Sequence, residues 1–193
     1  MKSTLPPMIA SRSLLIVRTV IGVLAISALL ASLPAAETTL DVLSGKKWAF
    51  YPGYEFPGAK GTCRLESVDN RDALVIEYDF TGGGAYVLAG TRVEIAQGPA
   101  ELRFDVKADR EMKIIVRIED SEKQSHQYNL LSNAAGEWET LTVDLAKPAN
   151  KSFGGPADGV IHYPITKFSV AVGKGKTTAE PGTAAISNIR TAE

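Results

Sequence analysis

The stretch from Lys113 to Leu131, KIIVRIEDSEKQSHQYNLL, restricts the fold of this chain more than any other part of the sequence. Its first half carries an apolar residue at every second position: Ile114, Val116 and Ile118. That period is typical of a β-strand with one buried face. Polar residues 120–123 favour a turn. We predict a hairpin that pairs Ile118 with His126, because this register keeps one face apolar.

The same register also pairs Val116 with Tyr128, and it gathers polar side chains on the other face of the hairpin. These side chains are Arg117, Glu119, Gln127 and Asn129. A polar sheet face is ordinarily only solvated. Planar donors and acceptors on rigid strands also suit the recognition of sugar hydroxyls. We therefore take Arg117, Glu119 and Gln127 as candidate carbohydrate-binding residues.

From Thr38 onward, short segments with the same period alternate with clusters of turn-forming residues, and no window has sustained helical spacing. This pattern predicts an all-β fold, a two-sheet antiparallel β-sandwich. The predicted core contains Leu74, Ile76, Leu102, Phe104, Ile114, Val116, Leu141, Val143, Phe168 and Val170. The longest irregular segment runs from Lys147 to Pro164, and a loop of that length in a compact domain is usually functional.

Residues 1–36 have the features of an export signal. Three basic residues and no acidic one accompany an apolar run from Val20 to Leu33, and small residues follow. We predict export to a periplasmic or extracellular location, with cleavage near Ala36. The main alternative is a retained membrane anchor, which is the only membrane association that we expect. Residues 37–193 are then predicted to form a single domain.

Charge and cysteine content exclude some roles for residues 37–193. Removing three basic residues from the 21 Lys and Arg of the chain leaves 18, against 22 Asp and Glu. A mildly acidic domain lacks the basic surface that nucleic acids require, so we expect no nucleic-acid partner. The single cysteine, Cys63, excludes an internal disulfide. No pattern in the sequence indicates an oligomeric state.

The sequence offers little for catalysis. Two histidines and one cysteine are poor material for a zinc hydrolase or a thiol enzyme. Glu77 and Asp79 resemble the carboxylate strands of jelly-roll glycosidases, but Thr81 stands where a further carboxylate is needed on that face. Glu119 and Asp120 are neighbours that point to opposite faces of a strand. We predict that the chain is not an enzyme.

Three motifs, EFPGAKG from Glu55, GGAYV from Gly83 and GGPADGVIH from Gly154, accompany a strand at Trp138 and a closing strand at Ile186. Together they resemble galactose-binding-like β-sandwich domains, which include several carbohydrate-binding-module families attached to secreted glycoside hydrolases. The resemblance extends over residues 48–190. It implies a jelly roll with a glycan-binding face, and it lends no catalytic residue.

The resemblance also implies one structural calcium ion. Glu55 is the matching acidic ligand near the first strands, and Asn188 stands in the last strand where the family often has a carboxylate. An amide oxygen can bind calcium but adds no negative charge, so a weaker site is expected. We predict that Glu55 and Asn188 lie close together. In the alternative, Glu55 only occupies a turn.

Other candidates come from aromatic residues and from the glycine-rich loop. Tyr86 and Trp138 lie out of phase with their apolar neighbours, so they are candidates for stacking on sugar rings, although packing roles are more common for such residues. Asp158 and His162 belong to the GGPADGVIH motif. They can contact a ligand, but we favour a structural role in shaping the loop.

Three functions agree with these observations. The first is a secreted, non-catalytic carbohydrate-binding module whose ligand is a polysaccharide or other glycan. The second is a protein-interaction or scaffolding β-sandwich. It is favoured because such modules usually adjoin an enzyme, whereas this chain ends at Glu193. The third, a small glycosidase, requires two facing carboxylates in a cleft.

Overall fold

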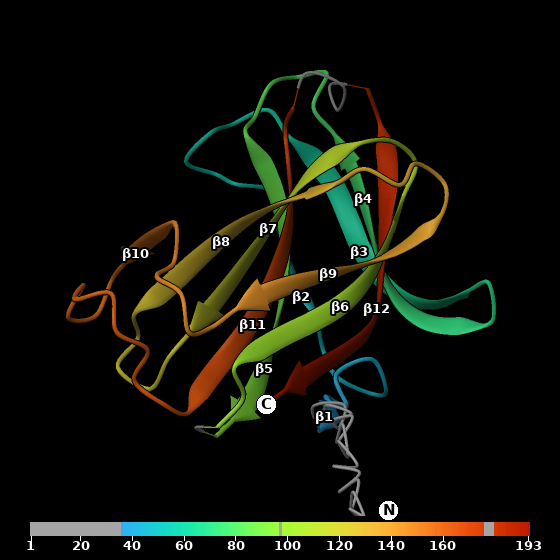
Figure 1. Ribbon diagram of the computed structural model, residues 1–193. Helices are drawn as coiled ribbons and strands as arrows, with labels where there is room; N and C mark the ends of the chain where they lie inside the picture. Colours follow the sequence, from blue (N-terminus) through green and yellow to red (C-terminus); the bar gives the residue numbers. More distant parts are fainter. Residues whose placement is uncertain (1–35, 97, 176–179) are drawn as a thin grey trace, which may run out of the picture. The chain divides into compact units, whose positions relative to one another are not determined.

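Residues 36–96, 98–175 and 180–193, which this computed structural model describes, form two antiparallel sheets of six strands each (Figure 1). The first, called the β12 sheet here, has the order β3-β4-β12-β6-β9, and β1 pairs with β12. Its strands are β1 (Glu37–Thr39), β3 (Lys60–Val68), β4 (Arg71–Asp79), β6 (Glu101–Ala108), β9 (Trp138–Asp144) and β12 (Gly182–Ala192).

The second sheet, called the β7 sheet, has the order β10-β8-β7-β11-β5-β2. Its strands are β2 (Ala49–Tyr51), β5 (Tyr86–Ile95), β7 (Met112–Glu119), β8 (Ser125–Ser132), β10 (Lys151–Phe153) and β11 (Ile165–Gly173). The described residues therefore form the all-β, two-sheet antiparallel sandwich that the sequence predicts. They include no helix that could span a membrane. The predicted export signal lies outside them, apart from Ala36.

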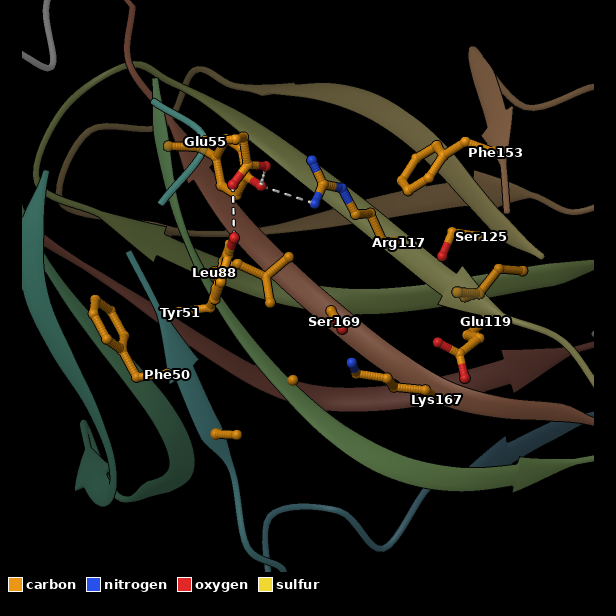
Figure 2. Close-up of a pocket in the computed structure, with 14 residues that line it drawn as sticks. Phe50, Tyr51, Glu55, Leu88, Arg117, Glu119, Ser125, Phe153, Lys167 and Ser169 are labelled. Carbon is orange, nitrogen blue, oxygen red and sulfur yellow. Dashed lines mark hydrogen bonds between the residues drawn. The ribbon is translucent and has the colours of Figure 1, made fainter. Parts of the chain in front are cut away.

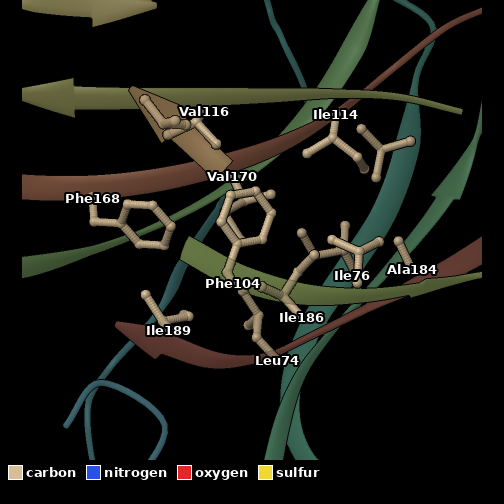
Figure 3. Close-up of a cluster of buried hydrophobic side chains, with 14 of the residues drawn as sticks. Leu74, Ile76, Phe104, Ile114, Val116, Phe168, Val170, Ala184, Ile186 and Ile189 are labelled. Carbon is tan, nitrogen blue, oxygen red and sulfur yellow. The ribbon is translucent and has the colours of Figure 1, made fainter. Parts of the chain in front are cut away.

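The core lies between the two sheets, and side chains from both sheets meet in it (Figure 3). Every predicted core residue is buried except Leu141, which is partly buried and packs against the core from the edge strand β9. Phe104 and Phe168 meet edge to face across the core, with their ring centroids 6.4 Å apart. Complete burial of one such side chain contributes about 1.5–3 kcal/mol to stability.

The predicted hairpin register is confirmed. β7 and β8 pair antiparallel with Ile118 opposite His126 and Val116 opposite Tyr128. His126 is buried on the core-facing side. Its Nε2 lies 3.2 Å from Asp120 Oδ2 and its Nδ1 lies 3.2 Å from Ser152 Oγ. The buried imidazole therefore has polar partners on both ring nitrogens, as burial of a polar group requires.

The segment from Lys147 to Pro164 is not irregular throughout. Its residues Lys151–Phe153 form β10, which pairs with β8 and places Phe153 opposite Ser125. The glycine-rich part that follows approaches the turn of the hairpin closely: a Cβ atom on Gly155, whose φ is +49°, would lie 2.6 Å from the carbonyl oxygen of Glu122. Sequence periodicity does not indicate β10, because a strand of three residues is too short to show an alternation.

Buried Asp120 fastens this loop to the hairpin turn. Its carboxylate accepts hydrogen bonds from the backbone N–H groups of Glu122, Gln124 and His162, at 3.0, 2.9 and 3.1 Å. Burial raises the pKa of Asp120, but the hydrogen bonds from His162 and Gln124 outweigh it and bring this pKa below its ordinary value. The end of the β7 sheet that carries Phe153 is therefore held by an ionised, buried carboxylate.

Candidate functional site

The outward face of the β7 sheet is hollowed because small residues meet across three neighbouring strands. Ala49, Gly90 and Ser169 lie side by side, since Gly90 is opposite Ala49 on one side and Ser169 on the other. A Cβ atom on Gly90 would lie 2.6 Å from Ser169 Oγ. Ser169 is followed across the sheet by Arg117 and Gln127, which rise above this floor.

The resulting hollow has a volume of about 430 Å³ (Figure 2). Its lining residues come from β2, β5, β7, β8, β10 and β11 and from the loop after β2: Ala49, Phe50, Tyr51, Glu55, Tyr86, Leu88, Gly90, Arg117, Ile118, Glu119, Ser125, Phe153, Lys167 and Ser169. A second hollow of about 420 Å³ adjoins it and shares Glu55, Tyr86, Arg117 and Phe153 with the first. These four residues therefore form the ridge between two hollows.

Arg117 is held on this ridge by contacts on several sides. Its Nε donates to Gln127 Oε1 at 2.9 Å and its Nη1 donates to Tyr86 Oη at 3.2 Å. The guanidinium carbon lies 4.6 Å from the ring centroid of Tyr86 and 5.6 Å from that of Phe153. Within the part of the chain that the structure describes, Nη2 has no hydrogen-bond partner. Cation–π contacts and hydrogen bonds thus fix a guanidinium that still has donors to offer.

Glu55 connects the loop after β2 to the same ridge. Its carboxylate accepts hydrogen bonds from the hydroxyls of Tyr86 and Tyr51, the second at 2.7 Å. The bond from Tyr86 is the main cause that lowers the pKa of Glu55. Burial, followed by the bond to Glu55, raises the pKa of the Tyr86 hydroxyl. At neutral pH the site therefore holds an ionised carboxylate between two neutral phenols.

Two aromatic rings beside Glu55 are open to solvent. Tyr54 is 72% exposed and Phe56 is 52% exposed. Tyr54 meets Tyr51 edge to face with ring centroids 5.0 Å apart, and Phe56 meets Tyr86 at 6.4 Å. Exposed rings supported from below by other rings offer rigid apolar surface at the edge of a polar hollow. This arrangement is suited to a ligand with both apolar faces and hydroxyl groups.

No family model matches this chain, and no curated protein matches it either. Among solved structures, it is similar to the family 11 carbohydrate-binding module of Clostridium thermocellum in complex with a β-1,3-1,4-mixed-linked tetrasaccharide. The TM-score is 0.60 at 16% identity, over 82% of this chain and 96% of that one. The fold is that of a carbohydrate-binding module.

A second similar structure is an agarase, AgWH50C, with a TM-score of 0.52 at 14% identity over 81% of this chain. The similar region covers 24% of the agarase chain. The structure described as PfGH50B is also similar over only part of its length: the TM-score is 0.53 at 12% identity, and the similar region covers 23% of its chain. At these identities the likeness establishes the fold alone.

The structure brings together four of the candidate carbohydrate-binding residues. Arg117, Glu119 and Gln127 point outward from β7 and β8, as the predicted register requires, and all three are partly exposed. Glu119 lines the larger hollow and pairs with Lys123 at 3.5 Å. Tyr86 lies on the same face, but only 4% of its surface is exposed. It supports Arg117 and Glu55 from below and does not present a free ring.

Trp138 does not join this group. It faces away from the core, as its phase predicts, but β9 pairs with β6 and so belongs to the β12 sheet. There its Nε1 donates to Asp69 Oδ2 at 2.9 Å, and the guanidinium of Arg71 lies 5.0 Å from its ring centroid. Alternation within a strand gives the facing of a residue but not the sheet that contains it, which explains the wrong grouping.

Asp158 and His162 hold the loop in place. Asp158 accepts hydrogen bonds from Gln124 Nε2 and from the backbone of Val160, each at 2.9 Å. His162 Nε2 lies 3.0 Å from Asp158 Oδ2. The bond from Gln124 is the main cause that lowers the pKa of Asp158 to about 2, and the bond to Asp158 is the main cause that raises the pKa of His162. These contacts agree with the structural role that we favoured.

The predicted calcium ligands are not brought together. The carboxylate of Glu55 accepts from two tyrosines on the β7 sheet, whereas Asn188 lies in β12 and donates from Nδ2 to Asp105 at 3.1 Å. The described residues contain no group of three or more His, Cys, Asp or Glu side chains that could hold a metal ion. The expected proximity is therefore wrong, and these two residues do not fit a shared calcium ion.

Several residues of the hollow were missed by sequence reasoning. Lys167 and Ser169 alternate with buried Phe168 and Val170, so their outward facing could have been inferred from the same period. Gly90 carried no comparable signal, because its importance depends on its neighbours across the sheet. Phe153 reaches the site only through β10. Gly90 and Phe153 therefore join the hollow through pairing between strands that are distant in the sequence.

Proposed function

We propose that this chain is an exported, non-catalytic protein that binds a polysaccharide on the outward face of the β7 sheet. The observation that carries the proposal is the ridge at Arg117. A guanidinium fixed between the rings of Tyr86 and Phe153 stands between two hollows, with exposed aromatic rings beside it. The likeness of fold to a module solved with a bound tetrasaccharide supports the same reading.

The size of the site suits a few sugar units of a longer chain. Each hollow has a volume of about 420–430 Å³, within the range of about 300–1,000 Å³ that is usual for small-molecule sites. Because the hollows share their ridge, a polymer that occupies both passes over Arg117. Arg117 Nη2 can donate to its hydroxyls, Glu119 and Ser125 can accept, and Tyr54 and Phe56 can cover an apolar ring face.

The carboxylates of the site support a binding role over a catalytic one. The larger hollow contains two of them, Glu55 and Glu119. A glycosidase needs a general acid whose pKa is raised, whereas that of Glu55 is lowered by its bond from Tyr86. Glu55 already accepts from two phenols, so its role is to position the ridge. The basic and apolar segment in residues 1–36 supports the proposed export.

The test is affinity electrophoresis of the purified protein through gels containing individual soluble polysaccharides, followed by titration calorimetry on those that retard it. We expect at least one polysaccharide to retard the protein, and we expect incubation with it to release no reducing ends. Release of reducing ends that an Arg117→Ala variant also shows would indicate an enzyme acting elsewhere. Lack of retardation by every polysaccharide would contradict the proposal.

Exposed Tyr54 and Phe56 favour a second candidate function, which is binding to a protein surface. Two adjacent, solvent-exposed aromatic rings are also typical of protein interfaces. Cross-linking of the purified protein to proteins from the medium of the producing cells distinguishes the two. A partner lost in the Tyr54→Ser/Phe56→Ser double variant, without any polysaccharide binding by the parent, would favour this function.

A further inference from the structure

Cations outnumber carboxylates around the two hollows. Lys113, Arg117, Lys151 and Lys167 line one or both of them, against Glu55 and Glu119. Resting on the proposed function, we infer that the polysaccharide bound here is anionic, carrying carboxylate or sulfate groups along its length. The wider chain is mildly acidic, so this local excess of positive charge is a property of the face and not of the composition.

The two carboxylates that line the hollows already have partners, whereas the lysines that line them have no ion-pair partner among the described residues. Glu55 accepts from Tyr51 and Tyr86, and Glu119 pairs with Lys123 at 3.5 Å. By contrast, the exposed residues Lys113, Lys151 and Lys167 form no ion pair with any residue in the described ranges. Figure 2 shows the ammonium group of Lys167 turned toward Ser169 on the floor of the hollow and away from Glu119.

Two cations of this face lie opposite each other without acidic partners. Arg92 lies directly opposite Lys167 in the pairing of β5 with β11. Arg92 is exposed, and among the described residues it has no acidic partner. Like charges directly opposite in a sheet are destabilising. The fold therefore tolerates a local cost here, and an anionic ligand lying over β5 and β11 would relieve it.

The β12 sheet shows how this chain treats outward cations elsewhere. Its outward arginines and one lysine are all within ion-pair distance of a carboxylate: Arg64, Arg71, Arg103, Arg190 and Lys107. Glu37, Glu66, Glu77, Asp69 and Asp105 provide those carboxylates. Lys60 at the start of β3 is an exception, because it has no ion pair among the described residues. The other outward cations named on that sheet are paired, whereas Lys113, Lys151 and Lys167 of the β7 sheet are not.

The positions of the cations match a polymer more closely than a single small anion. Lys167 lines one hollow, Lys113 and Lys151 line the other, and Arg117 lines both. Lys151 is also placed 5.6 Å from the ring centroid of Phe153, whose ring contacts Arg117 as well. Positive groups therefore recur along the path that crosses the ridge. Repeated anionic groups on successive sugar units can meet them in turn.

The experiment compares acidic polysaccharides with neutral derivatives of the same backbone. Polyuronates are tested beside their carboxyl-reduced forms, in which each carboxylate has become a primary alcohol, and sulfated polysaccharides beside their desulfated forms. Affinity electrophoresis and calorimetry are carried out at low and high salt. We expect at least one acidic polymer to bind at least about tenfold more tightly than its neutral form, with an advantage that shrinks as salt rises. The arm that shows it identifies the anionic group.

Single substitutions test whether the lysines of the β7 sheet cause the preference for the acidic polymer. Lys167→Gln and Lys151→Gln should each weaken binding of the acidic polymer several-fold and leave binding of its neutral form unchanged. Lys60→Gln, which removes an exposed lysine from β3 of the β12 sheet, is the matched control and should change neither. Circular dichroism and melting curves confirm that the variants are folded.

Three results would overturn the inference, and they differ in what else they remove. Binding of the neutral derivatives as tightly as the acidic polymers would overturn it while leaving the proposed polysaccharide-binding function intact. Failure of every acidic and neutral polymer to bind would remove the proposed function and the inference together. Equal weakening by Lys60→Gln and Lys167→Gln would also overturn it, because the effect would then come from net charge alone.

Discussion

The two outward faces of this sandwich arise from the same alternation of residues but differ in how their polar groups are used. On the β12 sheet, Asp105 accepts from Thr140 Oγ1 at 2.8 Å and from Asn188 at 3.1 Å, and it pairs with Arg71 and Arg190 at 3.2 and 3.4 Å. The polar groups on this face of the β12 sheet therefore form hydrogen bonds and ion pairs with one another. On the β7 sheet, Arg117 is held by aromatic rings and keeps donors free.

Both sheets carry small residues on their outward faces, but the side chains around these residues differ. On the β12 sheet, Ala73, Val75 and Ala185 are buried although they face away from the core. One hollow on that face, of about 360 Å³, is lined by charged side chains such as Arg64 and Lys107, which have acidic partners, and by no aromatic residue. On the β7 sheet, exposed Ala49 and buried Gly90 instead line the floor of the hollow beside aromatic side chains. A strand pattern alone therefore does not make a site.

The largest effect is expected from Asp105→Ala, which removes the centre of the paired face. Asp105 is buried, and its loss leaves Arg71 without its carboxylate and a hydroxyl and an amide without this acceptor, while Arg190 keeps only its pair with Glu37. We expect the free energy of unfolding to fall by about 3 kcal/mol, measured by urea denaturation. Polysaccharide affinity below the melting temperature should stay unchanged. A loss of affinity in the folded variant would show that the two faces are coupled.

Arg117→Ala should have the opposite profile. Loss of the guanidinium removes the ridge between the hollows, so affinity for the polysaccharide should fall about 100-fold, as for a central residue of a binding surface. Stability should change by no more than about 1 kcal/mol, because the residue is partly exposed. Arg71→Ala is the matched control, since Arg71 also lies over an aromatic ring, that of Trp138. It should leave affinity unchanged, and equal losses for both variants would refute the distinction between the faces.

A smaller effect is expected when the floor of the hollow is raised. Gly90→Val places a side chain against Ser169 Oγ, where even a Cβ atom would lie only 2.6 Å away. Valine is well suited to a strand, so the fold should persist while affinity falls about tenfold through lost volume. Calorimetry measures the change. Thr183→Val, at an exposed position of β12, is the control. Unchanged affinity in Gly90→Val would mean that the ligand does not reach the floor.

Part of this site could be predicted from the sequence because it depends on periodicity within one hairpin. The facing of Arg117, Glu119 and Gln127 follows from the burial of Ile118 and its pairing with His126. The alternation of Phe168 with polar neighbours would have given Lys167 in the same way. Local order along the chain is enough for these residues.

Other parts depend on which strands become neighbours, and no local pattern records that. The sequence pattern groups Trp138 with Arg117, although β9 lies in the other sheet. The family resemblance predicts that Glu55 and Asn188 lie close together, although Glu55 contacts tyrosines and Asn188 contacts Asp105. Phe153 reaches the hollow because three residues of a long loop pair with β8. The fold class was predictable, whereas the composition of each face was not.

The smallest effect, a pH-dependent change in stability, is expected from the contact between His162 and Asp158 beside the β7 sheet. Asp158 Oδ2 lies 3.0 Å from His162 Nε2, and Glu122 Oε1 lies 3.8 Å from its Nδ1. The bond to Asp158 is the main cause that raises the pKa of His162 above its ordinary value near 6.5, and the charges of Glu122 and Asp120 add to it. The pKa of Asp158 is lowered to about 2.

The folded protein therefore holds the His162 proton more tightly than the unfolded chain does. This stabilisation is fully present below about pH 6.5 and is lost as the pH rises through the raised pKa. At the acid end, the share due to Asp158 is present above about pH 4 and is lost as the pH falls toward about 2. The contact should thus contribute most between about pH 4 and pH 6.5. Melting temperatures of the parent and of His162→Gln, compared from pH 4 to pH 9, measure this contribution. The parent should melt higher at pH 5, with the difference shrinking toward pH 9. A difference that does not vary with pH would show that the loop beside the hollow is held without this charge pair.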